Sequence, residues 1–238
     1  MAKRKARPQT KSFTADSVLA ELKRLSTKAT KDGMTRFGIP SDNALGVTVG
    51  DIRDLGKKIG KQHELALELW KTGVYEARML CAFIEDPTAI TSVQMDEWCR
   101  DFDSWAICDT LCFHLYDKTP HAWKMIRTWA KRKPEFEKRS SFALLASVAL
   151  HDKQADDELF AESLELIANA SDDERNFVKK GVSWALRVIG GRNVSLHGAA
   201  MALAESLSNS ESPSARWIGK DALRDLKRPL VKKKVAKR

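Results

Sequence analysis

Apolar residues recur at helical spacing from one end of this 238-residue chain to the other. Segment 14–27, for example, places Val18, Leu22 and Leu25 on one helical face and opens with Thr14 as an N-cap. Patterns typical of β-strands are nearly absent, because strict alternation of apolar and polar residues is rare. We therefore expect an all-α protein, with helices near residues 14–27, 48–59, 62–72, 75–86, 91–102, 104–116, 119–132, 135–150, 156–170, 172–189, 194–207 and 213–227.

These helices pair up with a period of roughly 40 residues, which is typical of HEAT-like repeats. Stacked helix pairs align their second helices in a row that lines the inner wall of a curved solenoid. The sequence therefore predicts an α-solenoid (superhelix) of HEAT-like helical repeats. The predicted second helices are 75–86, 104–116, 135–150, 172–189 and 213–227.

Each of these second helices carries a charged residue among apolar neighbours. Because the second helices line the inner wall, the charged side chains are expected to form a stripe across the concave surface. A stripe of this kind would face a groove wide enough for an elongated ligand. Its members are Arg78, Asp109, Arg139, Lys180 and Lys220.

The charge distribution predicts a polyanionic partner. The formal net charge is +9, and two tails without acidic residues, 1–12 and 228–238, carry all of the excess. The segment between them, 13–227, is expected to be a single repeat domain. Basic tails are usually disordered arms that bind nucleic acid, although they can also serve solubility alone.

Other function classes find little support in the sequence. No apolar run approaches the roughly 18 residues of a membrane-spanning helix, and no secretory signal is visible, so we expect a cytoplasmic, nucleoid-associated protein without membrane contact. The five histidines have no metal-ligand spacing and no nucleotide-binding loop is present, so neither a metal nor a cofactor is expected. The four cysteines, expected to be buried reduced thiols, are Cys81, Cys99, Cys108 and Cys112.

Aromatic, acidic and basic residues on the second helices could together form a reactive site. Residues four positions apart share a helix face, as do the indole and carboxylate of the stretch WAICD and the two cations and indole of KKGVSWALR. Indole faces attract positive charge, a shielded carboxylate adds a full negative charge, and cations can hold phosphates. We expect a small patch of the inner wall that suits a cationic centre in a polyanion, formed by Trp105, Asp109, Arg139, Lys180, Trp184 and Arg187.

The same motifs resemble those of the AlkD-type DNA alkylation repair glycosylases. The resemblance is carried by Trp105-x3-Asp109, by Arg139 in FEKRSSFALL and by Trp184 in FVKKGVSWALR. It extends from MTRFGI (34–39) and ALGVTVGDIRDLGKKI (44–59) to ARWIGKDALRDL in the last predicted helix. It implies a HEAT-like solenoid that holds duplex DNA in its concave face and excises N3- and N7-alkylated purines without flipping the base.

The resemblance also implies a role for individual residues. Trp105 and Trp184 would cradle the deoxyribose of the lesion, Asp109 would be the catalytic carboxylate, and Arg139 would hold the DNA backbone. Ser104 stands where relatives often have a second tryptophan, and Phe37 stands where some have tyrosine. Further DNA contacts are expected from Lys180, Arg187, Arg53, Arg78, Lys220, Phe37 and Thr48.

Two other functions fit the predicted fold. One is a related solenoid that binds branched or distorted DNA without cleaving the glycosidic bond, and the other is a HEAT-type protein-binding scaffold. For the enzyme, the expected partner is double-stranded DNA containing alkylated purines, bound by a monomer. The remaining tryptophans are interpreted as packing residues: Trp70, Trp98, Trp123, Trp129 and Trp217.

Overall fold

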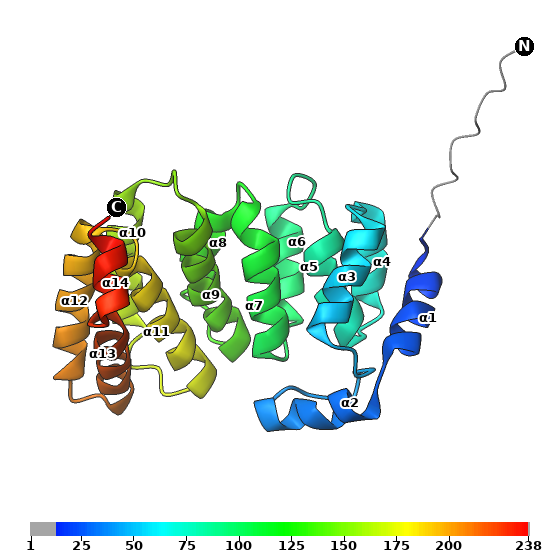
Figure 1. Cartoon of the computed structure of the whole chain (residues 1–238), viewed down its shortest axis with the longest axis horizontal. Helices are drawn as coiled ribbons and strands as arrows, with labels where there is room; N and C mark the ends of the chain where they lie inside the picture. The colour runs from blue at the N-terminus through cyan, green and yellow to red at the C-terminus, as the bar shows by residue number, and fades with distance from the viewer. Residues whose placement is uncertain (1–12, 238) are drawn as a thin grey trace, which may run out of the picture.

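A computed structural model of the chain describes residues 13–237, and this part folds into fourteen α-helices and two 3-10 helices without a strand (Figure 1). The helices are α1 (Ala15–Leu25), α2 (Lys28–Met34), η1 (Thr35–Phe37), α3 (Val49–Ile59), α4 (His63–Lys71), α5 (Tyr75–Ile84), α6 (Ser92–Arg100), α7 (Trp105–His114), η2 (Tyr116–Lys118), α8 (Ala122–Trp129), α9 (Glu135–His151), α10 (Asp157–Asn169), α11 (Asn176–Gly190), α12 (Val194–Ser208), α13 (Pro213–Leu226) and α14 (Pro229–Val235).

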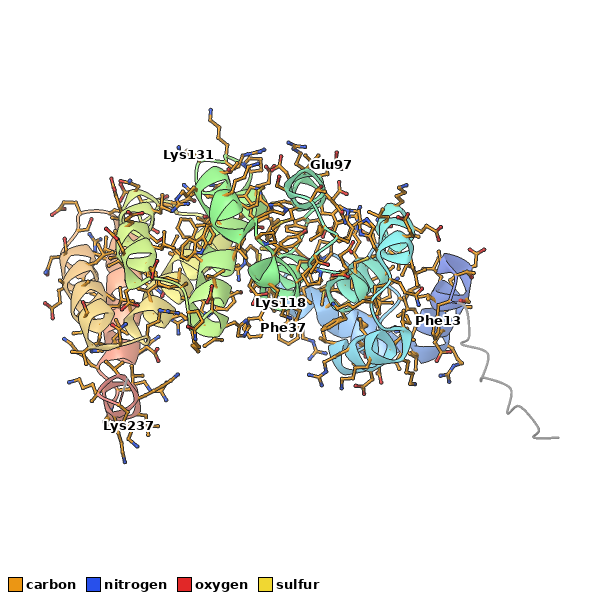
Figure 2. The ribbon with its side chains drawn as sticks, turned by 90° about the horizontal axis from the view of Figure 1, so that it is seen from above. Phe13, Phe37, Glu97, Lys118, Lys131 and Lys237 are labelled. Carbon is orange, nitrogen blue, oxygen red and sulfur yellow. The ribbon has the colours of Figure 1, made fainter. Side chains whose placement is uncertain are left out.

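The helices stack in two rows that curve into a crescent. Helices α3, α5, α7, α9, α11 and α13 pack side by side as an inner row, and each contacts a helix of the outer row, α4, α6, α8, α10 or α12. Seen from above, Phe37 and Lys118 lie toward the hollow of the crescent, whereas Glu97 and Lys131 lie on its outer side (Figure 2). The predicted α-solenoid of HEAT-like repeats is thus confirmed.

The core runs between the two rows because inner-row helices are covered on several sides. Helix α9, which packs against α7, α8 and α11, buries Phe142, Leu144 and Leu145 completely. A stacked pair of indoles fills the space between α4 and α6, with the ring centroids of Trp70 and Trp98 4.2 Å apart. Continuous apolar sequence on the inner row therefore reflects helices sandwiched between neighbours.

A buried carboxylate fixes the chain just before the inner row begins. Glu76 on α5 is fully buried and accepts hydrogen bonds from the backbone N–H groups of Leu45 (2.8 Å), Gly46 (2.6 Å) and Val47 (3.2 Å). Gly46 has φ +94°, and a Cβ there would lie 2.5 Å from the carbonyl oxygen of Thr27. The segment that precedes α3 is consequently held against α2 and α5 in one conformation.

Two helices were not expected from the sequence. Helix α2 follows α1 closely, and with η1 it extends across one edge of the crescent (Figure 1). Helix α14 lies within 228–238, which the sequence analysis treats as a disordered basic tail, and that expectation is wrong for residues 229–235. Pro229 at its first turn favours a helix start, and Val235 is buried. The other expected tail, 1–12, lies outside the described residues.

No helix within residues 13–237 combines the length and the apolar character needed to cross a membrane. The four cysteines are all buried and free. Burial strongly raises the pKa of Cys81 and Cys112 above that of an ordinary thiol. Both therefore behave as small apolar core residues rather than as nucleophiles.

Candidate functional site on the concave face

Helix α7 positions an indole and a carboxylate at one end of the inner row. Trp105 is its first residue and Asp109 follows one turn later, so both side chains leave the helix on the same face. The opposite face is buried through Cys108, Leu111 and Cys112, which fixes the rotation of the helix. The sequence expectation that Trp105 and Asp109 face the groove together is therefore met in the structure.

The carboxylate of Asp109 is held by two parallel hydrogen bonds from Arg139. The guanidinium donates from Nε to Oδ1 (2.9 Å) and from Nη2 to Oδ2 (2.7 Å), and Nη1 donates to the carbonyl oxygen of Phe177 (2.5 Å). The Arg139 side chain is only 7% exposed, against 21% for Asp109. Arg139 was expected to hold the DNA backbone, but most of its donors are engaged inside the protein.

Arg139 stays charged in this setting. Burial by itself lowers the pKa of a guanidinium, but the charge and hydrogen bonds of Asp109 outweigh burial and raise the pKa of Arg139. A bidentate arginine–carboxylate pair also fixes the plane of the carboxylate. Asp109 thus presents its remaining lone pairs to the groove in one orientation.

A pocket of about 570 Å³ opens over this pair, and we call it the Asp109 pocket. Its wall is built from three places in the chain: η1, the start of α7 and the N-terminal turns of α9 and α11. The residues that line it are Arg36, Phe37, Gly38, Trp105, Asp109, Arg139, Asn176, Phe177 and Lys180.

One side of the Asp109 pocket is closed by η1. The indole N–H of Trp105 donates to the carbonyl oxygen of Phe37 (2.8 Å), and this bond joins residues 68 positions apart. Gly38 has φ +66°, and a Cβ on it would lie 3.2 Å from the ring of Phe177. Glycine therefore allows η1 to turn in close contact with α11. The Phe37 ring is 65% exposed, as expected for a residue that contacts a ligand.

Trp184 does not line the Asp109 pocket, so the patch expected from the sequence is divided between two pockets. Lys180 is in the first, but Trp184, one turn further along α11, lines a neighbouring pocket of about 240 Å³. Val231 and Lys234 of α14 line this Trp184 pocket as well. The division arises because α14, which the sequence analysis did not anticipate, packs beside that part of α11.

Two of the expected DNA-binding arginines are engaged in internal contacts. Arg78 lies over the ring of Trp70 (5.0 Å) and donates to the backbone and carboxylate oxygens of Asp101. Arg187, which lines the Trp184 pocket, lies 3.5 Å from the carboxylate of Asp221. Both guanidinium groups thus also join neighbouring parts of the inner row.

The other expected contacts lie on the surface. Lys180, Lys220 and Arg53 are exposed on α11, α13 and α3. Thr48 is the N-cap of α3, where its hydroxyl oxygen accepts from the backbone N–H of Asp51 (3.2 Å). Its expected role in DNA binding is thus combined with a structural one.

Sequence reasoning missed three residues of the Asp109 pocket and misread one tryptophan. Arg36, Asn176 and Phe177 line the pocket, yet none has a distinctive spacing, because η1 reaches them only through the tertiary fold. Trp217 was interpreted as a packing residue but is 38% exposed, with the ammonium group of Lys179 5.1 Å from its ring.

A metal site finds no donors within residues 13–237, where no group of three His, Cys, Asp or Glu side chains is close enough to share an ion. The chemistry available to the Asp109 pocket is therefore that of one carboxylate, aromatic rings and the surrounding cations.

Comparison with solved structures shows the fold. The chain superposes with a TM-score of 0.75 on a protein described as belonging to a new family of proteins related to the HEAT-like repeat DNA glycosylases with affinity for branched DNA structures. The two share 21% identity over 89% of this chain and 95% of that chain. Two designed armadillo repeat proteins, one bound to a (KR)4 peptide, align at 13% and 14% identity with TM-scores of 0.38, covering 78% and 92% of this chain and 79% and 97% of theirs.

No curated protein matches the chain. The sequence profile of the DNA alkylation repair enzymes, in contrast, matches residues 18–226, from the first helix to the last residue of α13. This match covers both the inner and the outer row and every residue of the Asp109 pocket. The chain therefore belongs to the DNA alkylation repair enzyme family.

Proposed function

We propose that this protein is a DNA glycosylase that hydrolyses the N-glycosidic bond of positively charged N3- and N7-alkylated purines in duplex DNA, without flipping the base. The observation that carries the proposal is the pairing of Trp105 and Asp109 on one exposed face of α7, inside a pocket on the concave side. The family supports DNA repair, and the reaction is inferred from the chemistry of the pocket.

The residues suit a leaving group that needs no acid. An alkylated purine already carries a positive charge, so it can depart as a neutral base while the sugar becomes oxocarbenium-like. Asp109 and the face of Trp105 would stabilise that sugar, because both attract positive charge in a shielded site. Trp184 would contact the same sugar from the adjoining wall of α11.

Asp109 can also place the attacking water. A carboxylate has about four acceptor sites, and Arg139 occupies two of them. The remaining lone pairs can accept a hydrogen bond from a water on the sugar side. Arg139 is then a positioning residue that fixes the carboxylate, whereas Lys180 and Arg36 at the pocket wall would hold phosphates.

The test is single-turnover release of 7-methylguanine from duplex DNA. We expect release by the parent and a loss of about 10²–10³-fold for Asp109→Asn, the range found when one preorganised electrostatic contact is removed. Asp103→Asn is the matched control, because Asp103 is an exposed acid just before α7 that does not line the pocket. Equal rates for the parent and Asp109→Asn would refute the proposal.

A second function is favoured by the Arg139 clasp. Because two hydrogen bonds already engage Asp109, the site could serve to bind branched or distorted DNA without cleaving it, and the structural relative is described as having affinity for branched DNA. In that case a four-way junction would bind more tightly than linear duplex, and Asp109→Asn would keep this preference while neither protein releases base. In either case we propose a monomer that acts on nucleoid DNA in the cytoplasm.

A further inference from the structure

A second pocket on the inner row lies apart from the Asp109 pocket. It has a volume of about 330 Å³, and it is bounded by the C-terminal half of α3 and the C-terminal ends of α5 and α7. We call it the Phe83 pocket. Its lining residues are Arg53, Gly56, Lys57, Gly60, Lys61, Phe83 and His114.

Two aromatic rings form one side of the Phe83 pocket. The ring centroids of Phe83 and His114 are 4.9 Å apart, and both side chains are partly exposed. Burial, followed by the nearby charges of Lys118, His151 and Arg53, lowers the pKa of His114 below its ordinary value. At pH 7 the imidazole is therefore neutral, and a flat apolar group can stack on it.

Cations surround these rings. Arg53, Lys57 and Lys61 follow one another at four-residue spacing, so they project from the same side of α3 and its C-terminal end. Within the described residues, Arg53 makes no side-chain hydrogen bond or ion pair, and Lys57 has only an exposed partner, Asp54 (2.9 Å). Exposed pairs of this kind are weak, so both cations can turn to a ligand.

Lys61 has a more structural role. Its ammonium group donates to the carbonyl oxygens of Phe83 (3.1 Å) and Glu85 (2.7 Å), which places a charge beside the aromatic rings. Burial and then Lys118 lower the pKa of Lys61, and the nearby carboxylates of Asp86 and Glu85 oppose that effect. Neither carboxylate lines the pocket, so its rim is basic.

We propose that the Phe83 pocket binds an unpaired nucleotide, with its base stacked on Phe83 and His114 and its phosphate held by Arg53 and Lys57. An aromatic stacking surface inside a basic groove is the combination by which proteins bind single-stranded nucleic acid. The pocket volume lies within the range of small-ligand sites. The inference deepens the proposed function, since it rests on DNA lying along the inner row, but it does not require catalysis by Asp109.

The experiment compares two DNA ligands with the full-length protein: a paired duplex, and the same duplex with one bulged 2-aminopurine nucleotide. We expect the bulged duplex to bind at least about fivefold more tightly, the lower end of what one base–aromatic stack contributes, with quenched 2-aminopurine fluorescence. Phe83→Leu, which removes the ring but keeps an apolar side chain, should abolish both the preference and the quenching.

Matched variants separate stacking from charge and from folding. Phe113→Leu removes another partly buried ring from α7 that does not line the pocket, and it should leave the preference unchanged. Arg53→Gln should weaken the bulged duplex more than Lys58→Gln, an exposed lysine of α3 outside the pocket. If Phe83→Leu does not fold, His114→Ala replaces it with the same expected loss.

The outcomes also distinguish this proposal from the glycosylase proposal. Equal affinity of the parent for the two ligands, or a preference that survives Phe83→Leu, would overturn the nucleotide pocket even if base release is found. A Phe83-dependent preference in a protein that releases no base would support the pocket and contradict the glycosylase. Base release from paired duplex by Phe83→Leu should remain within about twofold of the parent.

Discussion

The indole of Trp105 makes two separate contributions. Its ring lines the Asp109 pocket, and its N–H donates to the carbonyl oxygen of Phe37. A buried or half-buried hydrogen bond of this type contributes about 1 kcal/mol. The side chain therefore both forms the site and holds the 3-10 helix that closes it.

Replacing Trp105 with phenylalanine should separate these contributions, because phenylalanine keeps an aromatic face and loses the donor. We expect amide hydrogen exchange at Gly38 and Ile39, whose N–H groups bond to the carbonyls of Thr35 and Met34, to become about fivefold faster. Trp217→Phe, on the exposed face of α13, is the control. Unchanged exchange at both amides in Trp105→Phe would show that the bond does not hold η1.

Among the elements, the connection between α10 and α11 depends on one carboxylate. Hydrogen bonds from Arg175 lower the pKa of Asp173 most, and Lys138, whose ammonium group lies 3.0 Å away, adds to the effect against the opposing contribution of burial. The backbone carbonyl of Asp173 also accepts from the hydroxyl of Ser214 on α13. Asp173 thus connects α9, α11 and α13 at one edge of the inner row.

The pH dependence of unfolding should reveal this contribution. The pKa of Asp173 is lower in the folded than in the unfolded state, so its stabilisation is complete above the unfolded value of about 3.9 and is lost as the pH falls toward the folded value. Asp173→Asn should lower the free energy of unfolding by about 1–3 kcal/mol at pH 7, measured with urea. The difference from the parent should shrink below about pH 4, whereas Asp172→Asn, its exposed neighbour, should match the parent throughout.

Elements that bury a regular apolar face could be predicted, and short polar ones could not. The twelve expected helices are all present, and Thr14 is the N-cap of α1, in a capping box with Ser17. Helix α2 was missed because KATKDGM has a single buried residue, Met34. Helix α14 was missed because its lysine run resembles a tail, and its apolar positions Val231 and Val235 gain a partner only in the folded protein.

The site was predictable where it lies on one helix and unpredictable where helices meet. Trp105 and Asp109 share a face because of spacing alone. The Arg139 clasp joins α7 to α9, and the separation of Trp184 depends on where α14 packs. Contacts between distant segments depend on how helices are rotated and offset, and one unaligned sequence does not specify that.

At the scale of the whole molecule, α14 extends the groove and covers part of it. Lys232, Lys233 and Lys234 are exposed on the helix, while Val231 and Val235 pack against the protein. Ending the chain at Lys227 should weaken binding to duplex DNA, flatten its salt dependence by about 0.9 per lost phosphate contact, and raise the oxidation of Trp184 in footprinting by mass spectrometry.

A charge variant distinguishes these two effects of α14. Lys232→Gln with Lys233→Gln keeps Val231 and Val235, so the salt dependence should flatten while Trp184 keeps its protection. An unchanged salt slope in both the shortened chain and the double variant would mean that α14 does not contact phosphates.

The inner row has one further property, which follows from its helices running in the same direction. Their negative C-terminal ends gather along a single edge, and basic side chains are bound there: Lys61 on the carbonyl of Phe83, Lys118 on that of His114 and Arg192 on that of Ala149. These charges balance helix ends rather than an outside polyanion. The number of counterions released when DNA binds should accordingly be smaller than a tally of lysines and arginines along the hollow suggests.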